Sequence, residues 1–479
     1  MTGTAGVPDR APRPAPRSFA PPNLVGPGDP GYDRACGSFN VAGVPAPAEA
    51  LVATTVAEVS AAVRYAVAAE RPVRVLATGH NPLSRPPMDG ALLIRTELGE
   101  AVRADPRART AWVAAGTRWE PVVRAAAAHG LTALHGSSPT IGVVGYLLHG
   151  GLSFYGRRHG VAANHVRALE LVTASGDLVR VDAEHDPELF WALRGGGGGF
   201  GIVTAVEIEL IPVAAAVSGA IFWPAEVAGS LLPAWRDWAA DAPREITTSL
   251  RLLNLPPLPG VPEALTGRQV LCLDGTAHAD TPEGTGRCAR IVADMLAPLR
   301  AIAEPIMDTW GRVGPVDVLR THMDPDEPLP YFSDHHLLAE LPDTLIAGFL
   351  AAAGPASGSP LLLAELRQLG GTFADPATPS GGVFDRVAAP WLYFAVGVPM
   401  GPATPAAIAA QHARTRAVLA PAITPFTAPS FIESTQQRQR TFDTDTARSV
   451  AAIRDRVDPD GIFRGDVSRG ALPTPESTA

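Results

Sequence analysis

Glycines and small hydroxyl residues alternate through the segment 135–151, which reads His-Gly-Ser-Ser-Pro-Thr-Ile-Gly-Val-Val-Gly-Tyr-Leu-Leu-His-Gly-Gly. Where side chains are absent, backbone N–H groups can converge on phosphate oxygens, and the hydroxyl groups of Ser137, Ser138 and Thr140 can donate further hydrogen bonds. The segment is therefore a candidate anion-binding loop. The same glycines could equally serve tight turns and close strand packing, and spacing alone does not separate the two interpretations.

A second glycine-rich segment, residues 195–199, differs from the first in its flanking elements. It follows a short predicted helix that begins at Asp186-Pro187, and it precedes an apolar run, 202–211, that is typical of a strand. A Rossmann dinucleotide motif has the opposite order, because its glycines must follow a strand and open a helix whose N-terminus meets the pyrophosphate. The sequence therefore argues against a Rossmann domain.

The elements around these two segments alternate between helices and strands. Residues 55–69 begin with the capping-box pattern Thr-Val-Ala-Glu, which predicts a helix, and residues 73–77 follow it as a buried strand. Residues 168–181 contain two strand patterns joined by Ser-Gly-Asp, which indicates a hairpin. Mixed α+β packing is the fold that these patterns favour.

The rest of the chain divides by composition. Residues 1–32 are crowded with proline and lack apolar periodicity, so we expect a disordered tail that buries too little surface to offset its ordering entropy. Residues 213–425 combine short strand and helix patterns with Pro-rich breaks, and we expect them to form a second domain. A further helix is predicted near 443–456, before a polar C-terminus.

Composition excludes several classes of function. The 479 residues carry a formal net charge of -9 without a Lys/Arg-rich run, so we do not expect nucleic-acid binding. Cys36, Cys272 and Cys288 are too few and too scattered for a disulfide framework or a four-ligand metal site, which suits a reducing cytoplasm. No apolar run reaches the roughly 18 residues that indicate a membrane span. We predict a cytoplasmic protein without a metal site or a membrane partner.

Four segments in order resemble the berberine-bridge-enzyme-like oxidases, a branch of the PCMH-type FAD-binding superfamily that also contains the vanillyl-alcohol oxidases. They are Pro72–His80, Gly136–Gly145, Leu193–Thr204 and Val457–Phe463. The resemblance implies an α+β fold with a PCMH-type FAD-binding domain at 45–212, to which residues 426–470 return. An inserted substrate domain at 213–425 would cover the flavin with an antiparallel sheet.

The resemblance also implies covalent FAD. In such enzymes the histidine of the first motif, here His80, is bonded to the 8α-methyl group of the flavin, and Gly79 leaves room for that approach. Many members add a bond from a cysteine to flavin C6. This chain has Ser138 at that place, and a hydroxyl is far less nucleophilic than a thiolate. We therefore expect FAD to be linked through His80 only.

The family motifs, carried onto this chain, predict the residues that contact FAD. These are His80, Gly79, Asn81, Ser137, Ser138, Thr140, Ile141, Gly142, Gly145, Tyr146, Gly150, Gly151, Asn164, Val166, Gly201, Ile202 and Val203. The chain departs from the family in three places. Thr78 and His149 stand where glycines are usual, and Asn164-His165 replaces an Asp-Asn pair. His149 could equally be a surface substitution or a group near the cofactor, and the roles of His149 and His165 are not predictable.

Oxidation of an alcohol or amine by flavin moves a hydride to N5 and usually needs a group that accepts the accompanying proton. The family commonly uses a tyrosine or a glutamate, and its usual tyrosine motif reads Phe431-Ile-Glu-Ser434 here. Phe431 cannot accept a proton, whereas Glu433 can, and in a strand both would share one face. Tyr393 is a second candidate, as a residue that lines the covering sheet. A solvated glutamate and a core tyrosine are the alternatives.

The sequence thus predicts an FAD-linked oxidase that dehydrogenates a small organic substrate in bacterial specialised metabolism and reduces O2 to hydrogen peroxide. A flavin-dependent monooxygenase or oxidative cyclase of the same fold is one alternative, and a flavin-binding protein without turnover is another. We expect a monomer or homodimer. The identity of the substrate is not predictable, because residues 213–425 contain no interpretable motif.

Overall fold

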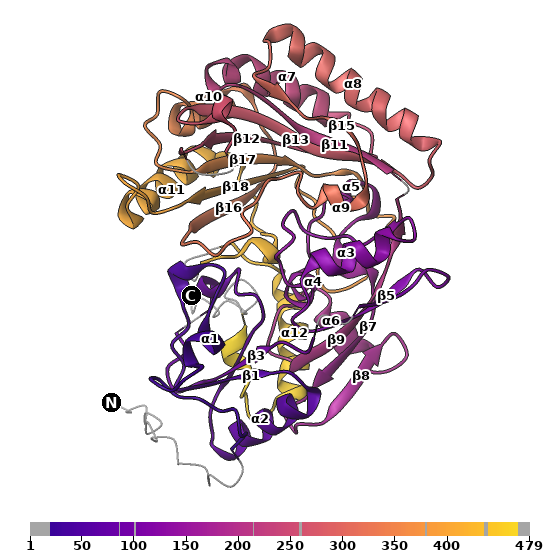
Figure 1. The fold of residues 1–479 in the computed structure, drawn as a ribbon, viewed down its shortest axis with the longest axis vertical. Coiled ribbons are helices and arrows are strands. Elements are labelled where there is room, and N and C mark those ends of the chain that lie inside the picture. The colour runs from indigo at the N-terminus through magenta and orange to yellow at the C-terminus, as the bar shows by residue number, and fades with distance from the viewer. Residues whose placement is uncertain are drawn as a thin grey trace.

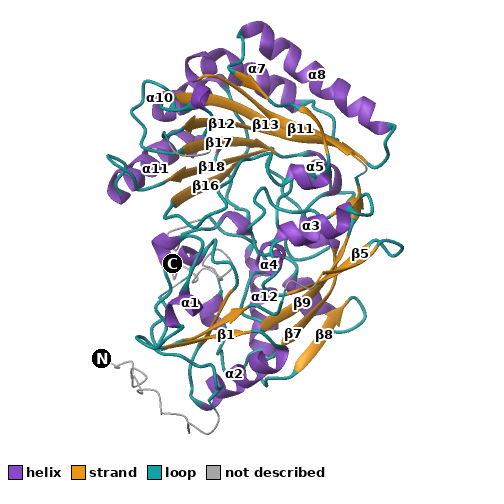
Figure 2. Cartoon of the chain, viewed as in Figure 1, coloured by secondary structure: helices purple, strands orange, loops and turns teal. Residues whose placement is uncertain are grey.

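The structure is a computed structural model that describes residues 20–85, 87–99, 102–213, 215–257, 261–378, 381–434 and 439–467. Two parts are stacked along the long axis of the molecule (Figure 1). The first part combines the beginning of the chain with its last helix, and the second is built from the middle of the chain. A large sheet of the second part lies over the first (Figure 2).

The first part contains two main sheets. The smaller is parallel and has the order β1 (Glu49–Ala53), β3 (Leu92–Thr96), β2 (Val73–Leu76). The larger is antiparallel and has the order β4 (Val102–Asp105), β5 (Thr110–Ala114), β9 (Ile202–Glu209), β7 (Val166–Val172), β8 (Leu178–Asp182). The hairpin expected at 168–181 is confirmed as β7 and β8. A short antiparallel pair joins β6 (Leu131–Thr132) and β10 (Ile211–Pro212).

Short helices connect and cover these sheets. They are α1 (Tyr32–Cys36), α2 (Val56–Ala68), α3 (Trp119–Ala127), α4 (Val143–Leu148), α5 (Gly156–His159), α6 (Pro187–Leu193) and α12 (Thr444–Val457). The predicted capping box is present at α2, where the hydroxyl group of Thr55 accepts a hydrogen bond from the backbone of Glu58 at 3.2 Å. Helix α6 begins at Pro187 with Asp186 as its N-cap, as predicted, so the Gly195–Gly199 segment lies between a helix and a strand.

The second part is an eight-stranded antiparallel sheet. Its order is β14 (Met307–Asp308), β11 (Ala215–Pro224), β13 (Gln269–Ala279), β12 (Ile246–Asn254), β17 (Leu363–Gln368), β18 (Trp391–Gly397), β16 (Phe332–Leu338), with β15 (Gly311–Val313) also paired to β11. Its outer face is covered by α7 (Ala228–Ala240), α8 (Gly284–Ile302), α10 (Asp343–Ala353) and α11 (Pro405–Leu419) (Figure 1). The inner face, beside α9 (Pro315–Val318), looks toward the first part.

The end of the chain joins the first part again. The backbone N–H of Val73 donates to the carbonyl of Ile462 at 2.7 Å, and the guanidinium of Arg454 donates to the carbonyl of Gly196 at 2.6 Å. The α+β class and the covering antiparallel sheet expected from the sequence are confirmed.

The sequence predicts a disordered tail over residues 1–32, but the last part of this range is ordered. Residues 1–19 lie outside the described residues, but residues 20–32 are described and contact the first part. The backbone of Val25 pairs with that of Ala50 in an antiparallel bridge, with an N···O distance of 2.8 Å in each direction. A high proline content therefore did not prevent this segment from joining the edge strand β1, because backbone pairing needs only a few free N–H and C=O groups.

Candidate active site

Two adjoining cavities lie between the sheets. The first is lined by the end of β2 and the loop after it, by helix α4, by the Gly195–Gly201 segment and by Asp466. The second lies between the loop at Gly136–Ser138 and the inner face of the covering sheet. The two cavities share a wall, whose residues are His80, Ile141, Tyr146, Ser430 and Glu433. A ligand that fills the first cavity would therefore meet a second molecule at this wall.

His80 is fixed in the shared wall by contacts on several sides. Its ring stacks on Phe39 with centroids 4.0 Å apart, and its Nε2 lies 3.1 Å from the hydroxyl of Thr140. The hydroxyl of Tyr331 donates to the carbonyl of His80 at 2.5 Å. Burial lowers the pKa of His80 to about 4, so the imidazole is neutral near pH 7. A neutral ring of fixed orientation is the form that can act as a nucleophile.

Gly79 is required by the backbone beside His80. Its φ is +75°, and a Cβ there would lie 2.7 Å from the Cα of Ser38. The close approach of the two backbones thus explains the glycine, and the loop carries His80 into the wall as a result.

The first cavity has the features of a site for a large polar ligand. Gly145 lines it, and a Cβ built on Gly145 would meet no atom within 4 Å, so the glycine leaves open space on the cavity side of α4. The hydroxyl of Tyr146 and the Oδ1 atom of Asn81 are buried without a hydrogen-bond partner among the described residues. Buried polar atoms are normally paired, so a ligand with hydrogen-bonding groups is expected here.

Gly145 offers a direct test of this cradle. We expect Gly145→Leu to fold, because the residue is helical and leucine has a better helix propensity than glycine. Its side chain would occupy ligand space, and overpacking of about 1–3 kcal/mol corresponds to roughly 5- to 150-fold weaker binding. The FAD content of the purified variant, measured by absorbance beside its melting temperature, checks this. Gly145→Ala is the control, and full FAD content in the leucine variant would contradict the assignment.

The structure brings most of the predicted FAD contacts to these cavities. Gly79, His80, Asn81, Ile141, Gly142, Gly145, Tyr146, Gly201 and Val203 line the first cavity. Ser137 and Ser138 line the second cavity instead. Thr140 lines neither, but it contacts His80 and the hydroxyl of Ser138 at 2.9 Å.

Five further residues that the sequence predicts to contact FAD also lie outside the cavity walls. Val166 and Ile202 begin strands and point into hydrophobic cores. Gly150 and Gly151 have φ angles of +87° and +79° and lie against the rings of Phe384 and Tyr146. Asn164 donates to the carbonyl of Asp385 at 2.8 Å. In the structure these residues take part in backbone turns and packing, and none of them lines a cavity.

His149, for which a surface position and a place near the cofactor were both open, lies in the first cavity. Its Nδ1 lies 2.8 Å from the carbonyl of Gly145, and burial, with a contribution from Arg85, lowers its pKa to about 4. Asp466 lines the same cavity from the end of the chain, and burial raises its pKa. His165 lies elsewhere, with its Nε2 2.9 Å from the carbonyl of His159. Only the spacing of His149 from Gly145, one helical turn, could have indicated its position.

Glu433 is the acidic residue in the wall between the cavities. Burial raises its pKa to about 7, against the hydrogen bond that Ser333 donates to it, and the charge of Asp324 raises it further. The strand expected at Phe431–Glu433 is absent, because Pro429–Phe431 forms a 3-10 turn. Phe431 and Glu433 nevertheless both line the second cavity. A carboxyl group with a pKa near 7 is a suitable general base.

Tyr393 is not at this site, which corrects the second catalytic candidate. Within β18, Phe394 and Val396 line the second cavity, so Tyr393 points to the opposite, helix-covered face. There its ring packs edge to face on Phe349 with centroids 6.1 Å apart and stacks with His336. Tyr393 is a core residue of the covering sheet.

Aromatic and aliphatic side chains contribute much of the wall of the second cavity, and polar groups lie among them. The apolar residues are Phe39, Leu152, Leu329, Leu362, Leu363, Phe394, Val396 and Phe431. The polar groups include Ser137, His322, Asp324 and Arg367, in addition to His80, Ser430 and Glu433 of the shared wall. A small molecule with an apolar body and few polar groups would match these walls.

Residues 47–182 match the family of FAD binding domains. The chain is 31% identical over 223 residues to (R)-6-hydroxynicotine oxidase from Paenarthrobacter nicotinovorans, which covers 45% of this chain and 49% of that protein. The chain thus spans about half the length of this curated relative.

Two solved structures extend the likeness in fold over nearly the whole chain. The berberine-bridge-enzyme-like protein 1 of Physcomitrella patens superimposes with a TM-score of 0.79 at 20% identity and covers 93% of this chain and 96% of its own. Glucooligosaccharide oxidase from Acremonium strictum, which carries a 6-S-cysteinyl, 8α-N1-histidyl FAD, gives a TM-score of 0.75 at 18% identity, with 94% and 97% covered.

Among the described residues, the helices are all too short or too polar to cross a lipid bilayer.

Proposed function

We propose that this chain, which has the FAD-binding domain and the fold of the berberine-bridge-enzyme-like FAD-linked oxidases, is an FAD-dependent oxidoreductase that oxidises a small organic substrate. One observation carries the proposal. A cavity with an open glycine cradle and a cavity with apolar walls meet at a wall that holds His80 and Glu433. A cofactor in the first cavity and a substrate in the second would therefore be adjacent, with a proton acceptor between them.

The residues of the first cavity fit FAD. Gly145 leaves open space on the cavity side of α4, and Gly142 and Gly201 also line this cavity. The unpaired polar atoms of Asn81 and Tyr146 offer hydrogen bonds to FAD. Bound FAD would supply the hydride acceptor and would pass the electrons to O2, which yields hydrogen peroxide.

Within this arrangement Glu433 accepts the proton that leaves the substrate. Its carboxylate is the active form, and the hydroxyl of Ser333 donates a hydrogen bond that holds it in place. The rings of Phe394 and Phe431 on the neighbouring wall exclude water, which strengthens the electrostatic contacts of the bound substrate. The apolar walls contribute by positioning the substrate against this carboxylate.

His80 is the proposed site of covalent attachment. The contact with Thr140 engages its Nε2, which leaves Nδ1 for a bond to the flavin. The 8α-N1-histidyl FAD of the glucooligosaccharide oxidase supports a link of this kind. No thiol stands at Ser138, whose hydroxyl contacts Thr140, so the proposal includes one covalent bond only.

The setting of the enzyme is part of the proposal. All three cysteines are free and buried, which suits a reducing cytoplasm. A role in bacterial specialised metabolism would suit the second cavity, because its aromatic and aliphatic side chains favour a compact organic molecule over a highly hydroxylated one.

Anaerobic mixing tests the proposed reaction. The purified protein is combined with a panel of amines and alcohols that have apolar bodies, and the visible absorbance of the flavin is followed. Bleaching by at least one compound, with return of colour and formation of hydrogen peroxide when air is admitted, is the expected result. Compounds that bind without bleaching, across the whole panel, would instead indicate a flavin-binding protein without turnover.

A further inference from the structure

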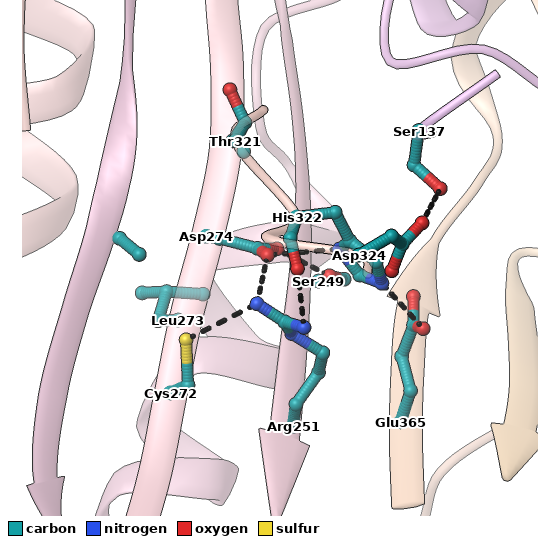
Figure 3. A network of polar contacts seen from close by, with 12 residues as sticks. Ser137, Ser249, Arg251, Cys272, Leu273, Asp274, Thr321, His322, Asp324 and Glu365 are labelled. Carbon is teal, nitrogen blue, oxygen red and sulfur yellow. Dashed lines mark hydrogen bonds and ion pairs between the residues drawn. The ribbon is translucent and has the colours of Figure 1, made fainter. Parts of the chain in front are cut away.

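Five buried charged side chains form a charged cluster at the covering sheet, and two of them, His322 and Arg367, line the second cavity. Figure 3 labels the other three, Arg251, Asp274 and Glu365, together with His322. Asp274 is 2.5 Å from Arg251 and 2.9 Å from the Nδ1 atom of His322. Glu365 lies 3.2 Å from the Nε2 atom of the same histidine and 2.6 Å from Arg367. The two acids are fully buried and the three basic groups are at most 5% exposed. Each acid thus bridges two basic groups.

The five side chains of the charged cluster carry one positive charge in excess. Burial and Arg251 oppose protonation of His322, but Asp274 and Glu365, one on each ring nitrogen, outweigh them and raise its pKa to about 9. With His322 protonated, Arg251, His322 and Arg367 provide three cations against the two carboxylates. Uncompensated charge is costly in a buried site, so a further anion is expected close by.

Asp324 is that anion, and it faces the second cavity. It accepts a hydrogen bond from Ser137 at 3.2 Å, and no basic group among the described residues lies within 4 Å of its carboxylate. The positive charge of the cluster favours the ionised form of Asp324, although burial raises the pKa of Asp324. The negative charge of Asp324 is therefore balanced by the more distant cations of the cluster, whereas no cation among the described residues contacts its carboxylate directly.

The backbone holds Asp324 in this position. Arg251 donates to the carbonyl of His322 at 2.9 Å, and this bond connects the loop that carries Asp324 to the charged cluster. The next residue, Met323, has a φ of +55°, which non-glycine residues rarely adopt and which is typically retained where the structure has a use for it. On either side of Met323, His322 contacts Asp274 and Glu365, and both His322 and Asp324 line the second cavity.

The second cavity therefore favours one class of ligand. Its wall holds two carboxyl groups, Asp324 and Glu433, whereas the basic groups that reach it, His322 and Arg367, are already paired with Glu365. We propose that Asp324 is a substrate-binding residue that pairs with the ammonium group of an amine whose body is apolar. A carboxylate ligand would meet two acids and no unpaired cation. This inference rests on the proposed function, since it assigns the second cavity to the substrate.

Three probes of similar shape and different charge test the proposal: benzylamine, benzyl alcohol and benzoate. Their affinities for the FAD-loaded protein are measured by calorimetry and by the change in flavin absorbance near pH 7. We expect benzylamine to bind most tightly and benzoate least. Asp324→Asn should weaken benzylamine about tenfold or more, as loss of a hydrogen bond to a charged group does, and should leave benzyl alcohol nearly unchanged.

Asp326→Asn is the matched control, because Asp326 lies in the same loop, is exposed and pairs with Arg320 at 2.8 Å. It should leave all three affinities unchanged. Benzoate that binds as tightly as benzylamine, benzylamine that does not bind, or an Asp324→Asn variant that binds it normally would overturn the proposal. The ranking of the probes on the unaltered protein decides the matter even if the variant does not fold. Failure of the proposed function is distinguishable, because it would appear as unbleached flavin with the charge ranking intact.

Discussion

Replacement of Glu433 by glutamine is expected to lower the rate of flavin reduction by substrate about 10²- to 10⁴-fold, the usual contribution of a general base. The amide has nearly the same shape as the carboxyl group but cannot accept the proton. FAD content and substrate binding should change little, because the glycine cradle and the apolar walls are untouched. Rapid-mixing absorbance measurements under anaerobic conditions give the rate.

The control for this variant is Glu340→Gln, an exposed glutamate outside both cavities, which should retain the normal rate. The pH dependence provides a second check. Burial raises the pKa of Glu433 to about 7, so the rate should increase as the pH rises through about 7 and the carboxylate forms. Ser333 stabilises that carboxylate, and Ser333→Ala should therefore move the increase to higher pH. A Glu433→Gln variant with an unchanged rate would exclude Glu433 as the base.

Replacement of His80 by alanine is expected to convert FAD from acid-stable to fully extractable. The unaltered protein should keep its FAD in the pellet after acid precipitation, because the bond to the imidazole survives unfolding. In His80→Ala the cradle at Gly142 and Gly145 would still bind FAD before acid is added. Acid should then release the FAD into the supernatant, where its absorbance is measured.

Ser138→Ala is the matched control for the covalent bond. Ser138 is buried next to Thr140, which also contacts His80, so the change perturbs the same loop without removing the imidazole. FAD should stay in the pellet of this variant. Acid-stable FAD in His80→Ala would show that another residue forms the bond.

The sequence predicts those parts of the site whose positions depend on residues that are close to one another in sequence. Gly79 and His80 follow directly from the end of β2, and Gly142 and Gly145 lie at the start of α4, so a short motif fixes both loops. The capping box of α2 is equally local, since its two partners are three residues apart.

The parts that sequence did not predict depend on the direction of a side chain or on the order of strands. Strand alternation places Tyr393 and Phe394 on opposite faces, but only the packing of α10 and α11 determines which face is the core. Arg251, Asp274 and Glu365 lie on three strands, and they meet only because β13, β12 and β17 are neighbours in the sheet. No spacing in the sequence indicates that order.

Peptide mapping of the unaltered protein tests whether FAD is bonded to His80, because it identifies the residue that carries the cofactor. The purified protein is digested, and flavin-bearing peptides are identified by absorbance and mass spectrometry. We expect flavin on the peptide that contains His80 and none on the peptide that contains Ser138. A His80 peptide of unmodified mass, with flavin absent or bonded elsewhere, would contradict this expectation.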